Sequence, residues 1–469
     1  MDWLANISWN RGSLRQFVYG IVLGISLTYT TTSLISSLRR RRAHDRISKF
    51  SPRPIELRTD DVVNGVVGLI GNTPLIRINS LSDALGVEIL GKAEFLNPGG
   101  SVKDRVALRV IDDAERQGLL HPNSGSRIFE GTVGSTGISL TTVARARYAA
   151  IIIPDDVAED KARALQALGA HIEKVRPASI VDKKQASKLN LARQRALEFG
   201  ESDILRSMNA SSTGETADDA STVLSTLVVR SSVSNREVLG MDSSPDDELK
   251  TKARGFFADQ FENKSNYDAH YEGTGPEIWR QTNGRIAAFV SGAGTGGTLS
   301  GVGCFLKSMD ENVIVTLADP EGSGLYNKIK FGIMYDEREK EGTKRRHQVD
   351  TVVEGIGINR LTRNFEFALP IVDEAFRISD AEAVSMSRHL VQKDGLFLGS
   401  SSACNLFACV KLAKEKGWRS GERIVTILCD SGSRHYSKFW NDDYLQGAGI
   451  PVDSTIVEAA LKNGAGDDH

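Results

Sequence analysis

The chain contains 469 residues, of which 40% are hydrophobic and 25% are charged, a composition typical of a globular protein with a sizeable core. Its formal net charge of −2 gives no general attraction to nucleic acid. The four cysteines form no CxxC pair, and no two of the eight histidines lie within one helical turn. A disulfide framework and a structural zinc site are therefore not expected, which favours a reducing compartment.

The N-terminal segment, residues 1–45, differs from the rest and is expected to be a membrane-anchor helix or a targeting segment. No charged residue occurs within Gln16–Leu38, and four arginines follow at 39–42. About 20 mainly apolar residues suffice to cross a bilayer as a helix. The alternative is a cleaved mitochondrial presequence, because residues 3–44 contain no Asp or Glu. The anchor is favoured because the arginines flank the apolar run, whereas an amphipathic presequence would interleave them.

Short β-rich runs alternate with helical patterns from about Val62 to Phe439. The helical patterns include Lys103–Gln117 and Glu159–Leu168, and Gly169 follows the second as a typical helix end. Seven runs are typical of strands: Leu75–Ile78, Glu88–Lys92, Arg127–Glu130, Ile151–Ile153, Ile286–Val290, Val313–Leu317 and Ile424–Leu428. The alternation predicts an α/β fold of parallel strands with helices on both faces.

Residues 200–252 interrupt this alternation. They are rich in Ser, Thr, Asp and Glu, and contain a single apolar cluster at Val223–Val229. Such a segment buries too little apolar surface to offset the entropy lost on ordering. We therefore expect a disordered insertion at 200–252 within a larger α/β domain at 60–455, and a loose tail at 458–469.

One lysine stands in a distinctive local motif, Asn97–Arg105, which reads Asn-Pro-Gly-Gly-Ser-Val-Lys-Asp-Arg. A Pro-Gly-Gly turn leaves a strand, and Lys103 follows in the first turn of the next helix. The positive end of the helix dipole disfavours the charged ammonium there. Desolvation lowers a lysine pKa further and supplies the free amine that imine chemistry requires. Taken alone, the motif also fits an exposed lysine at the start of a helix.

A glycine-rich turn, Gly292–Thr298, directly follows the predicted strand Ile286–Val290. Backbone amides of such a turn, opening a helix, form a cradle for an anion. The spacing of Gly292, Gly294 and Gly297 also matches a dinucleotide fingerprint, with Asp319 near the offset of a ribose contact. The alternative reading is therefore an NAD-dependent oxidoreductase. The threonines within the turn, however, suit a terminal phosphate.

Two further turns of small residues each precede a helical pattern. Glu130–Gly137 reads Glu-Gly-Thr-Val-Gly-Ser-Thr-Gly, and its hydroxyls and amides could hold a carboxylate at a helix N-terminus. Gly399–Ala403 reads Gly-Ser-Ser-Ser-Ala. Each turn by itself is equally compatible with ordinary helix capping.

Together the four motifs resemble those of the fold type II pyridoxal-phosphate enzymes, the tryptophan synthase β-like class, and within it the cysteine synthases (O-acetylserine sulfhydrylases). The similarity runs from about Gly68 to Gly432 and includes Asp259–Asn263 and Gly273–Trp279. The chain looks most similar to the fungal cysteine synthase 2 group, which is associated with mitochondria. This resemblance implies two doubly wound α/β subdomains, pyridoxal 5'-phosphate as cofactor, and a homodimer that binds no nucleic acid.

The resemblance also implies roles for individual residues. Lys103 would hold the cofactor as a Schiff base and act as the base on the substrate Cα. Ser401 would bond the pyridine nitrogen, and a serine there favours β-elimination over a long-lived carbanion. The cofactor phosphate would be held by Gly294, Thr295, Gly296, Gly297 and Thr298. The substrate α-carboxylate would be held by Thr132, Val133, Ser135, Thr136 and Gln260. The implied reaction converts O-acetyl-L-serine and sulfide into L-cysteine and acetate.

The substrate loop departs from the family pattern, which usually reads Thr-Ser-Gly-Asn-Thr-Gly. Val133 and Ser135 replace the Ser and the Asn, and the Asn normally contacts the cofactor. Ser135 is also a cofactor-binding candidate, with a shorter reach than the amide it replaces. Cystathionine β-synthase, a serine dehydratase and a cofactor-binding pseudo-enzyme are therefore kept as alternatives. Only about thirty residues follow Phe439, too few for the regulatory module that cystathionine β-synthases commonly carry.

The charges around the apolar run predict an orientation. Four arginines follow it, against Arg11 and Arg15 before it, and such clusters stay on the cytosolic side. For a mitochondrial protein this predicts an outer-membrane anchor with the catalytic domain facing the cytosol. The alternative is import into the matrix with removal of the presequence.

Overall fold

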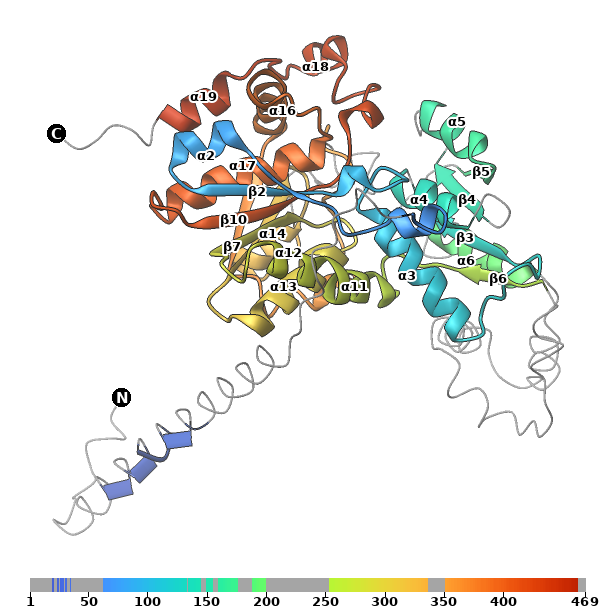
Figure 1. The fold of residues 1–469 in the computed structure, drawn as a ribbon, viewed down its shortest axis with the longest axis horizontal. Coiled ribbons are helices and arrows are strands. Elements are labelled where there is room, and N and C mark those ends of the chain that lie inside the picture. Colours follow the sequence, from blue (N-terminus) through green and yellow to red (C-terminus); the bar gives the residue numbers. More distant parts are fainter. Residues whose placement is uncertain are drawn as a thin grey trace, which may run out of the picture. The chain divides into compact units, whose positions relative to one another are not determined.

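A computed structural model describes residues 62–132, 134–144, 149–154, 159–175, 188–199, 253–335 and 351–462, together with ten residues between 19 and 34. The chain divides into two compact units, and the larger, Glu56–Lys307 with Asn312–His469, contains both β-sheets. Figure 1 shows the elements of this unit as a ribbon. The predicted insertion at 200–252 lies outside the described residues.

Most of the predicted anchor at 1–45 also lies outside the described residues. The ten residues described there, which include Tyr19, Leu23, Leu27 and Leu34, are helical and exposed. Within the part of the chain that the structure describes, no helix combines the length and the apolar character needed to cross a membrane.

The larger sheet has six strands in the order β1-β2-β10-β7-β8-β9. Its strands are β1 (Leu75–Arg77), β2 (Glu88–Ala93), β10 (Arg423–Leu428), β7 (Ala288–Gly292), β8 (Ile314–Pro320) and β9 (Glu374–Ile378). Neighbouring strands run parallel, with Val425 paired to Leu90 on one side and to Phe289 on the other. The exception is β1, which pairs with β2 in the antiparallel direction. The prediction of purely parallel strands was therefore wrong at this edge, where a short turn and helix suffice to reverse the chain.

The smaller sheet has four parallel strands in the order β5-β4-β3-β6. They are β5 (His171–Val175), β4 (Ala149–Pro154), β3 (Arg127–Gly131) and β6 (Gly255–Phe257). Successive side chains of β3 point to opposite faces: Ile128 packs with Leu140 and Phe256, whereas Phe129 packs with Ala192. The sheet is therefore buried on both faces, as expected for parallel strands.

Helices flank both sheets. They are α2 (Asn79–Leu85), α3 (Lys103–Arg116), α4 (Ser135–Val143), α5 (Glu159–Ala167), α6 (Lys188–Glu198), α11 (Ser265–Ala269), α12 (Gly275–Gln281), α13 (Gly297–Met309), α14 (Leu325–Phe331), α15 (Arg363–Glu366), α16 (Asp380–Asp394), α17 (Ser400–Glu415), α18 (Asp442–Gly447) and α19 (Thr455–Lys462). Single turns of other helix types occur at η2 (Val66–Leu69), η3 (Glu94–Leu96), η4 (His270–Thr274) and η6 (Gly432–Arg434). Because each sheet has helices on both faces, the predicted α/β class with two subdomains is confirmed.

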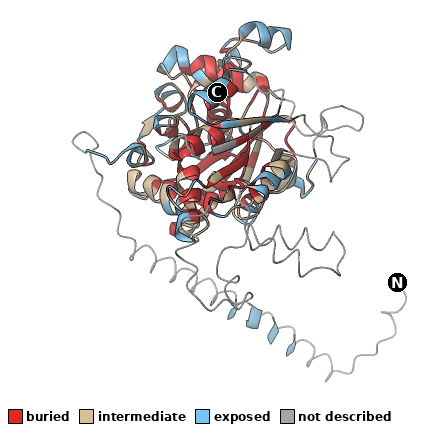
Figure 2. Ribbon diagram, turned by 90° about the vertical axis from the view of Figure 1, so that its right-hand side faces the viewer, coloured by how far each residue is buried: buried red, intermediate tan, exposed pale blue. Residues whose placement is uncertain are grey.

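The main core lies between the larger sheet and α17, which packs against β10 and β7 (Figure 1). Leu406 and Val410 of α17 are fully or almost fully buried, as are Ile424 and Val290 of the strands. Each such aliphatic side chain contributes about 1.5–3 kcal/mol when it is fully buried. Figure 2 shows the same pattern, with buried residues concentrated in the strands and in the helix sides that face them.

Local signals in the sequence account for several helix ends. α16 begins at a capping box in which Ser379 Oγ accepts from Glu382 N and the Glu382 carboxylate accepts from Ser379 N. It ends at Gly395, whose φ of +68° favours glycine. α5 is likewise followed by Gly169, with φ +89°, as the sequence predicted. α19 extends to Lys462, so the first residues of the predicted tail at 458–469 are helical, and 463–469 lie outside the described residues.

Candidate active site

Lys103 is the first residue of α3, and the turn before it is fixed by side-chain contacts. Asn97 Oδ1 accepts a hydrogen bond from Gly71 N at 2.8 Å, and Asn97 Nδ2 donates to Glu94 O at 2.9 Å. Gly100 has a φ of +77°, in the left-handed region that glycine adopts without strain. The conformation of the Pro-Gly-Gly turn therefore sets where α3 begins.

Two backbone contacts join this turn to the carboxyl end of β10. Ser101 forms an antiparallel bridge with Asp430, and Val102 N donates to Cys429 O at 3.1 Å. β10 is a central strand of the parallel part of the sheet. Lys103 thus lies beyond the carboxyl ends of parallel strands, the position at which open α/β sheets bind their ligands.

The surroundings of Lys103 favour the neutral amine. Burial lowers the pKa of this half-buried lysine, and the opposing influence of Cys429 and Asp430 is smaller. Burial is also the main cause that lowers the pKa of the neighbouring His270 to about 3, so the imidazole is neutral. A lysine with a lowered pKa offers more free amine at neutral pH, which imine formation requires.

The glycine-rich turn lies at the N-terminus of α13, which begins at Gly297. A Cβ atom on Gly294 would stand 2.4 Å from Gly355 O, and one on Gly296 would stand 2.5 Å from Phe365 N. Only glycine fits at these close approaches. The first four amides of a helix lack partners within it, so the turn presents backbone donors to an anion.

The two threonines of this turn add hydroxyl groups at the same helix end. The Thr295 hydroxyl is buried and accepts from Asn266 Nδ2 at 2.8 Å. The Thr298 hydroxyl lies 3.1 Å from His270 Nε2. Amides and hydroxyls are donors that bind phosphate oxygens, so the residues present fit a terminal phosphate group.

The predicted substrate loop is brought to the phosphate turn by one asparagine. Thr136 Oγ1 donates to Gln260 Oε1 at 2.5 Å, and both side chains are buried. Asn266 Nδ2, which bonds the phosphate-turn threonine, also donates to Gln260 O at 2.7 Å. Thr132 is buried at the start of the loop, whereas Val133 lies outside the described residues.

Ser135 contacts an arginine that the sequence analysis did not single out. Arg434 Nη1 donates to Ser135 Oγ at 3.1 Å, and Nη2 of the same guanidinium donates to Gly99 O. Arg434 therefore joins the start of α4 to the turn before Lys103. The arginine comes from η6, 299 residues along the chain from Ser135, so no local pattern indicated the pair.

The serine-rich turn lies beside the same end of β10. Ser401 is buried in the first turn of α17. Cys429 N donates to Ser402 Oγ at 2.8 Å. Burial raises the pKa of Cys429 to about 11, so this thiol stays protonated at neutral pH. Hydrogen bonds thus link the other three predicted motifs, directly or through intervening residues, to the turn that carries Lys103.

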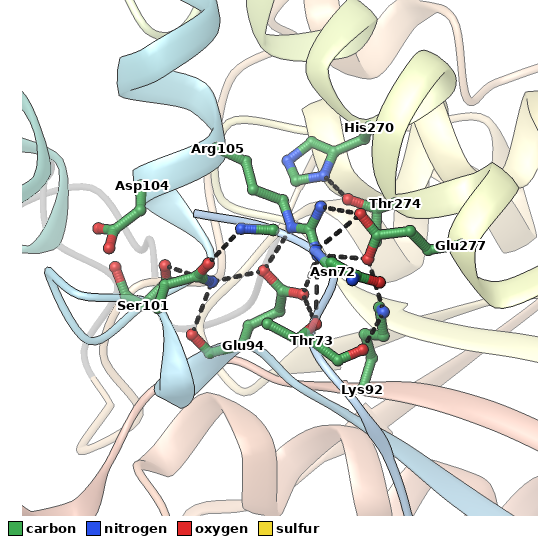
Figure 3. A network of polar contacts seen from close by, with 12 residues as sticks. Asn72, Thr73, Lys92, Glu94, Ser101, Asp104, Arg105, His270, Thr274 and Glu277 are labelled. Atoms are coloured by element: carbon green, nitrogen blue, oxygen red, sulfur yellow. Dashed lines mark hydrogen bonds and ion pairs between the residues drawn. The ribbon is translucent and has the colours of Figure 1, made fainter. Parts of the chain in front are cut away.

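A buried ion cluster surrounds Arg105, which lies two residues after Lys103 (Figure 3). The Arg105 guanidinium binds Glu94 through Nε at 2.7 Å and Nη2 at 2.8 Å. The same guanidinium binds Glu277 of α12 through Nη1 and Nη2, both at 2.8 Å. Thr73 Oγ1 donates to Glu94 Oε1 at 2.7 Å. One arginine therefore makes paired contacts with two carboxylates, the strongest geometry for such an interaction.

Lys92 supplies the second cation of the cluster, 2.7 Å from Glu277 Oε2. Burial lowers the pKa of Lys92 to about 8, although Glu277 opposes this shift. Burial alone would raise the pKa of Glu277, but Arg105 and Lys92 hold it well below its usual range. Two cations and two anions therefore balance, and they fix the first turn of α3, where Arg105 lies two residues after Lys103.

Replacing Arg105 tests this cluster. In Arg105→Met two buried carboxylates lose their shared cation, and we expect a loss of about 3–5 kcal/mol in the free energy of unfolding, measured by urea denaturation. Arg116→Met is the matched control on the same helix, because the Arg116 side chain is 63% exposed and pairs with Asp113 at the surface. The control should change stability by no more than about 0.5 kcal/mol. Equal losses in the two variants would contradict a structural role for the cluster.

Comparison with known proteins identifies the family. Residues 66–212 and 228–430 match the model of the family described as "Pyridoxal-phosphate dependent enzyme". The chain is 45% identical to cysteine synthase 2 of Schizosaccharomyces pombe, over 94% of this chain and 98% of that protein. It is 49% identical to cysteine synthase 2 of Emericella nidulans, over 90% and 92% respectively.

A solved structure is also similar. It is a hydrogen sulfide-producing enzyme from Fusobacterium nucleatum, with a TM-score of 0.56 and 25% sequence identity, and the alignment covers 80% of this chain and all of that one. A cystathionine beta-synthase from Apis mellifera is a more distant relative, 31% identical, of which the alignment covers 66%.

These matches decide between the two readings of the glycine-rich turn. The turn lies inside the matched residues, so it belongs to a pyridoxal-phosphate enzyme, and the alternative of an NAD-dependent oxidoreductase is wrong. The matched region also includes the lysine motif and the substrate loop. The chain belongs to the pyridoxal-phosphate dependent enzyme family, and within it to the cysteine synthases.

Proposed function

We propose that the chain makes L-cysteine from O-acetyl-L-serine and sulfide, with pyridoxal 5'-phosphate as cofactor. The observation that supports the proposal is the position of Lys103, a lysine of lowered pKa whose turn is joined to the carboxyl end of β10, where Cys429 also contacts the serine turn. In the reaction a proton leaves Cα, the Cβ–O bond breaks and acetate departs with the electron pair. Sulfide then forms the new C–S bond at Cβ, and a proton returns to Cα.

Each predicted residue has a part in this proposal. The bound cofactor supplies the electron sink that makes the Cα proton removable. The Lys103 amine takes that proton and returns it. The turn of Gly294–Thr298 holds the phosphate, and Ser401 bonds the pyridine nitrogen. The substrate α-carboxylate is held by Thr132, Val133, Ser135, Thr136 and Gln260.

The contact between Ser135 and Arg434 bears on the departure in the substrate loop. Ser135 is shorter than the asparagine that the family usually has at this position. Arg434 donates to Ser135 Oγ, which leaves the serine proton free to point into the site. We propose that Ser135, oriented in this way, replaces the missing amide donor. The guanidinium also adds positive charge near the position proposed for the substrate carboxylate.

The reaction can be tested directly. Purified protein loaded with pyridoxal phosphate should release cysteine and acetate in equal amounts from O-acetylserine and sulfide. Lys103→Ala should lose about 10³-fold or more of this rate, because the proton transfers lack their base. Formation of cystathionine from serine and homocysteine would favour a cystathionine β-synthase, and release of pyruvate and ammonia from serine would favour a dehydratase. A protein that binds the cofactor without turning over any of these substrates would be a pseudo-enzyme.

We further propose a mitochondrial location, with residues 1–45 as an outer-membrane anchor and the enzyme facing the cytosol as a homodimer. In support, a relative from Saccharomyces cerevisiae has "mitochondrial cysteine synthase" in its name and is 45% identical over 83% of this chain. The uncharged run Gln16–Leu38 is followed by four arginines. Such an asymmetry keeps the following domain on the cytosolic side.

Protease treatment of intact mitochondria tests the location. An outer-membrane anchor predicts that added protease removes the catalytic domain while the matrix proteins remain intact. Size-exclusion chromatography of the released domain should give the mass of two chains. A domain that survives until both membranes are opened, with an N-terminus beyond Arg42, would instead support a cleaved presequence.

A further inference from the structure

Four charged side chains form a line at one border of the candidate site. Lys161 Nζ lies 2.5 Å from Glu354 Oε2, and His435 Nδ1 lies 3.2 Å from the same oxygen. His435 Nε2 lies 3.0 Å from Asp430 Oδ2. Lys161, Glu354 and His435 lie outside the motifs from which the site was predicted. Cation and anion alternate along the line, so it is electrically balanced.

The line begins at the substrate loop. Lys161 lies on α5, a helix of the smaller sheet, and its side chain is 18% exposed. A Cβ atom on Gly134, within the substrate loop, would stand 4.0 Å from Lys161 Cδ. The apolar part of this lysine therefore packs beside the loop, while its ammonium reaches out of the smaller subdomain to Glu354.

Glu354 is the point at which the other parts of the site meet. Its backbone amide donates to Ser400 Oγ at 2.9 Å, in the serine turn at the start of α17. The next residue, Gly355, lies so close to Gly294 of the phosphate turn that no side chain fits between them. A movement of Glu354 would therefore disturb both turns that the cofactor is proposed to contact.

The line ends at Asp430, just after β10, where the chain contacts the lysine turn. His435 is 5% exposed, and its partner Asp430 bridges to Ser101, two residues before Lys103. Burial alone would lower the pKa of His435, but Asp430 and Glu354 outweigh it and raise the pKa to about 9. His435 is therefore a cation at neutral pH and keeps two carboxylates together.

We propose that Lys161 and Glu354 are positioning residues that hold the substrate loop against the cofactor-binding turns, with His435 linking this ion pair to the lysine turn. The proposal rests on the proposed function, since it assigns the loop to the amino-acid substrate. None of the three side chains touches the reacting atoms. Their effect is on where Thr132–Thr136 lies relative to Lys103.

The first test separates positioning from general stability. Lys161→Met and Glu354→Gln should each raise the KM for O-acetylserine about tenfold, within the range usual for coupled sites. The KM for sulfide and the visible absorption of the bound cofactor should stay unchanged. The KM for O-acetylserine of the double variant should be no higher than that of the weaker-binding single variant. In Lys161→Arg, which keeps the cation, this KM should stay close to the wild-type value. Arg163→Met is the matched control, because Arg163 is an exposed cation on the same helix that pairs with Glu159.

The second test does not depend on turnover. In the cofactor-loaded protein, amide hydrogen exchange of the segment from Thr132 to Val143 should be faster in Lys161→Met and Glu354→Gln than in wild type or Arg163→Met. Unchanged exchange in this segment, or an unchanged KM in an active enzyme, would overturn the proposal. Wild-type protein without cysteine synthesis would instead refute the proposed function, and the exchange measurement would still test the positioning.

The third test uses pH. Three charged groups face His435: Asp430, Glu354 and, behind Glu354, Lys161, while Arg434 points to Gly99 and Ser135. The pKa of His435 is higher in the folded protein than its ordinary value of 6.5, so its stabilising effect is complete below about pH 6.5 and lost as the pH rises through about 9. The difference in melting temperature between wild type and Glu354→Gln should therefore narrow between pH 7 and pH 10. A constant difference would mean that His435 takes no part in the link.

Discussion

The contact between Arg105 and its two carboxylates, Glu94 and Glu277, holds the turn before Lys103 in place. Glu94 follows strand β2 of the larger sheet, Glu277 lies on α12, and Arg105 lies on α3, which packs in the core of the smaller sheet. The guanidinium therefore crosses from one subdomain to the other. A buried pair of this kind costs desolvation free energy, and its function is to fix one arrangement, here that of the turn before Lys103.

Two ionic links with different exposure thus join the two sheets. The Arg105 cluster is almost completely buried, and replacing one partner would leave an unpaired charge. The line from Lys161 to Asp430 reaches the surface, because the Lys161 side chain is 18% and the Glu354 side chain 27% exposed. Exposed ion pairs are weaker and more sensitive to salt and pH. The lysine turn is therefore held by a buried ionic link, and the substrate loop lies beside a link that reaches the surface.

Much of the fold could be predicted from the sequence, because local patterns encode it. Each of the seven predicted strands overlaps an observed strand, and α3 begins at Lys103, the lysine of the predicted motif. Three strands were missed for identifiable reasons. β6 has only three residues, and β5 and β9 contain charged residues such as Glu173 and Arg377, which obscure the apolar pattern of a buried strand.

The site was only partly predictable, for a related reason. Its glycine, serine and lysine turns are contiguous in sequence, so each could be recognised alone. The side chains that hold the turns together come from distant parts of the chain: Arg105 and Glu277 are 172 residues apart, and Lys161 and Glu354 are 193 apart. A charged residue with a distant partner cannot be distinguished in sequence from one at the surface.

The central claim is that the fold directs Lys103, and no other lysine, to the cofactor. Borohydride reduction of the cofactor-loaded protein makes the link between lysine and pyridoxal phosphate permanent, and peptide mass spectrometry then locates it. The account predicts a single modified peptide containing Lys103. Lys92 is the informative competitor, because its pKa is also lowered, to about 8, but it is held by Glu277 in the ion cluster. Modification of Lys92, or of several lysines without preference, would contradict the account.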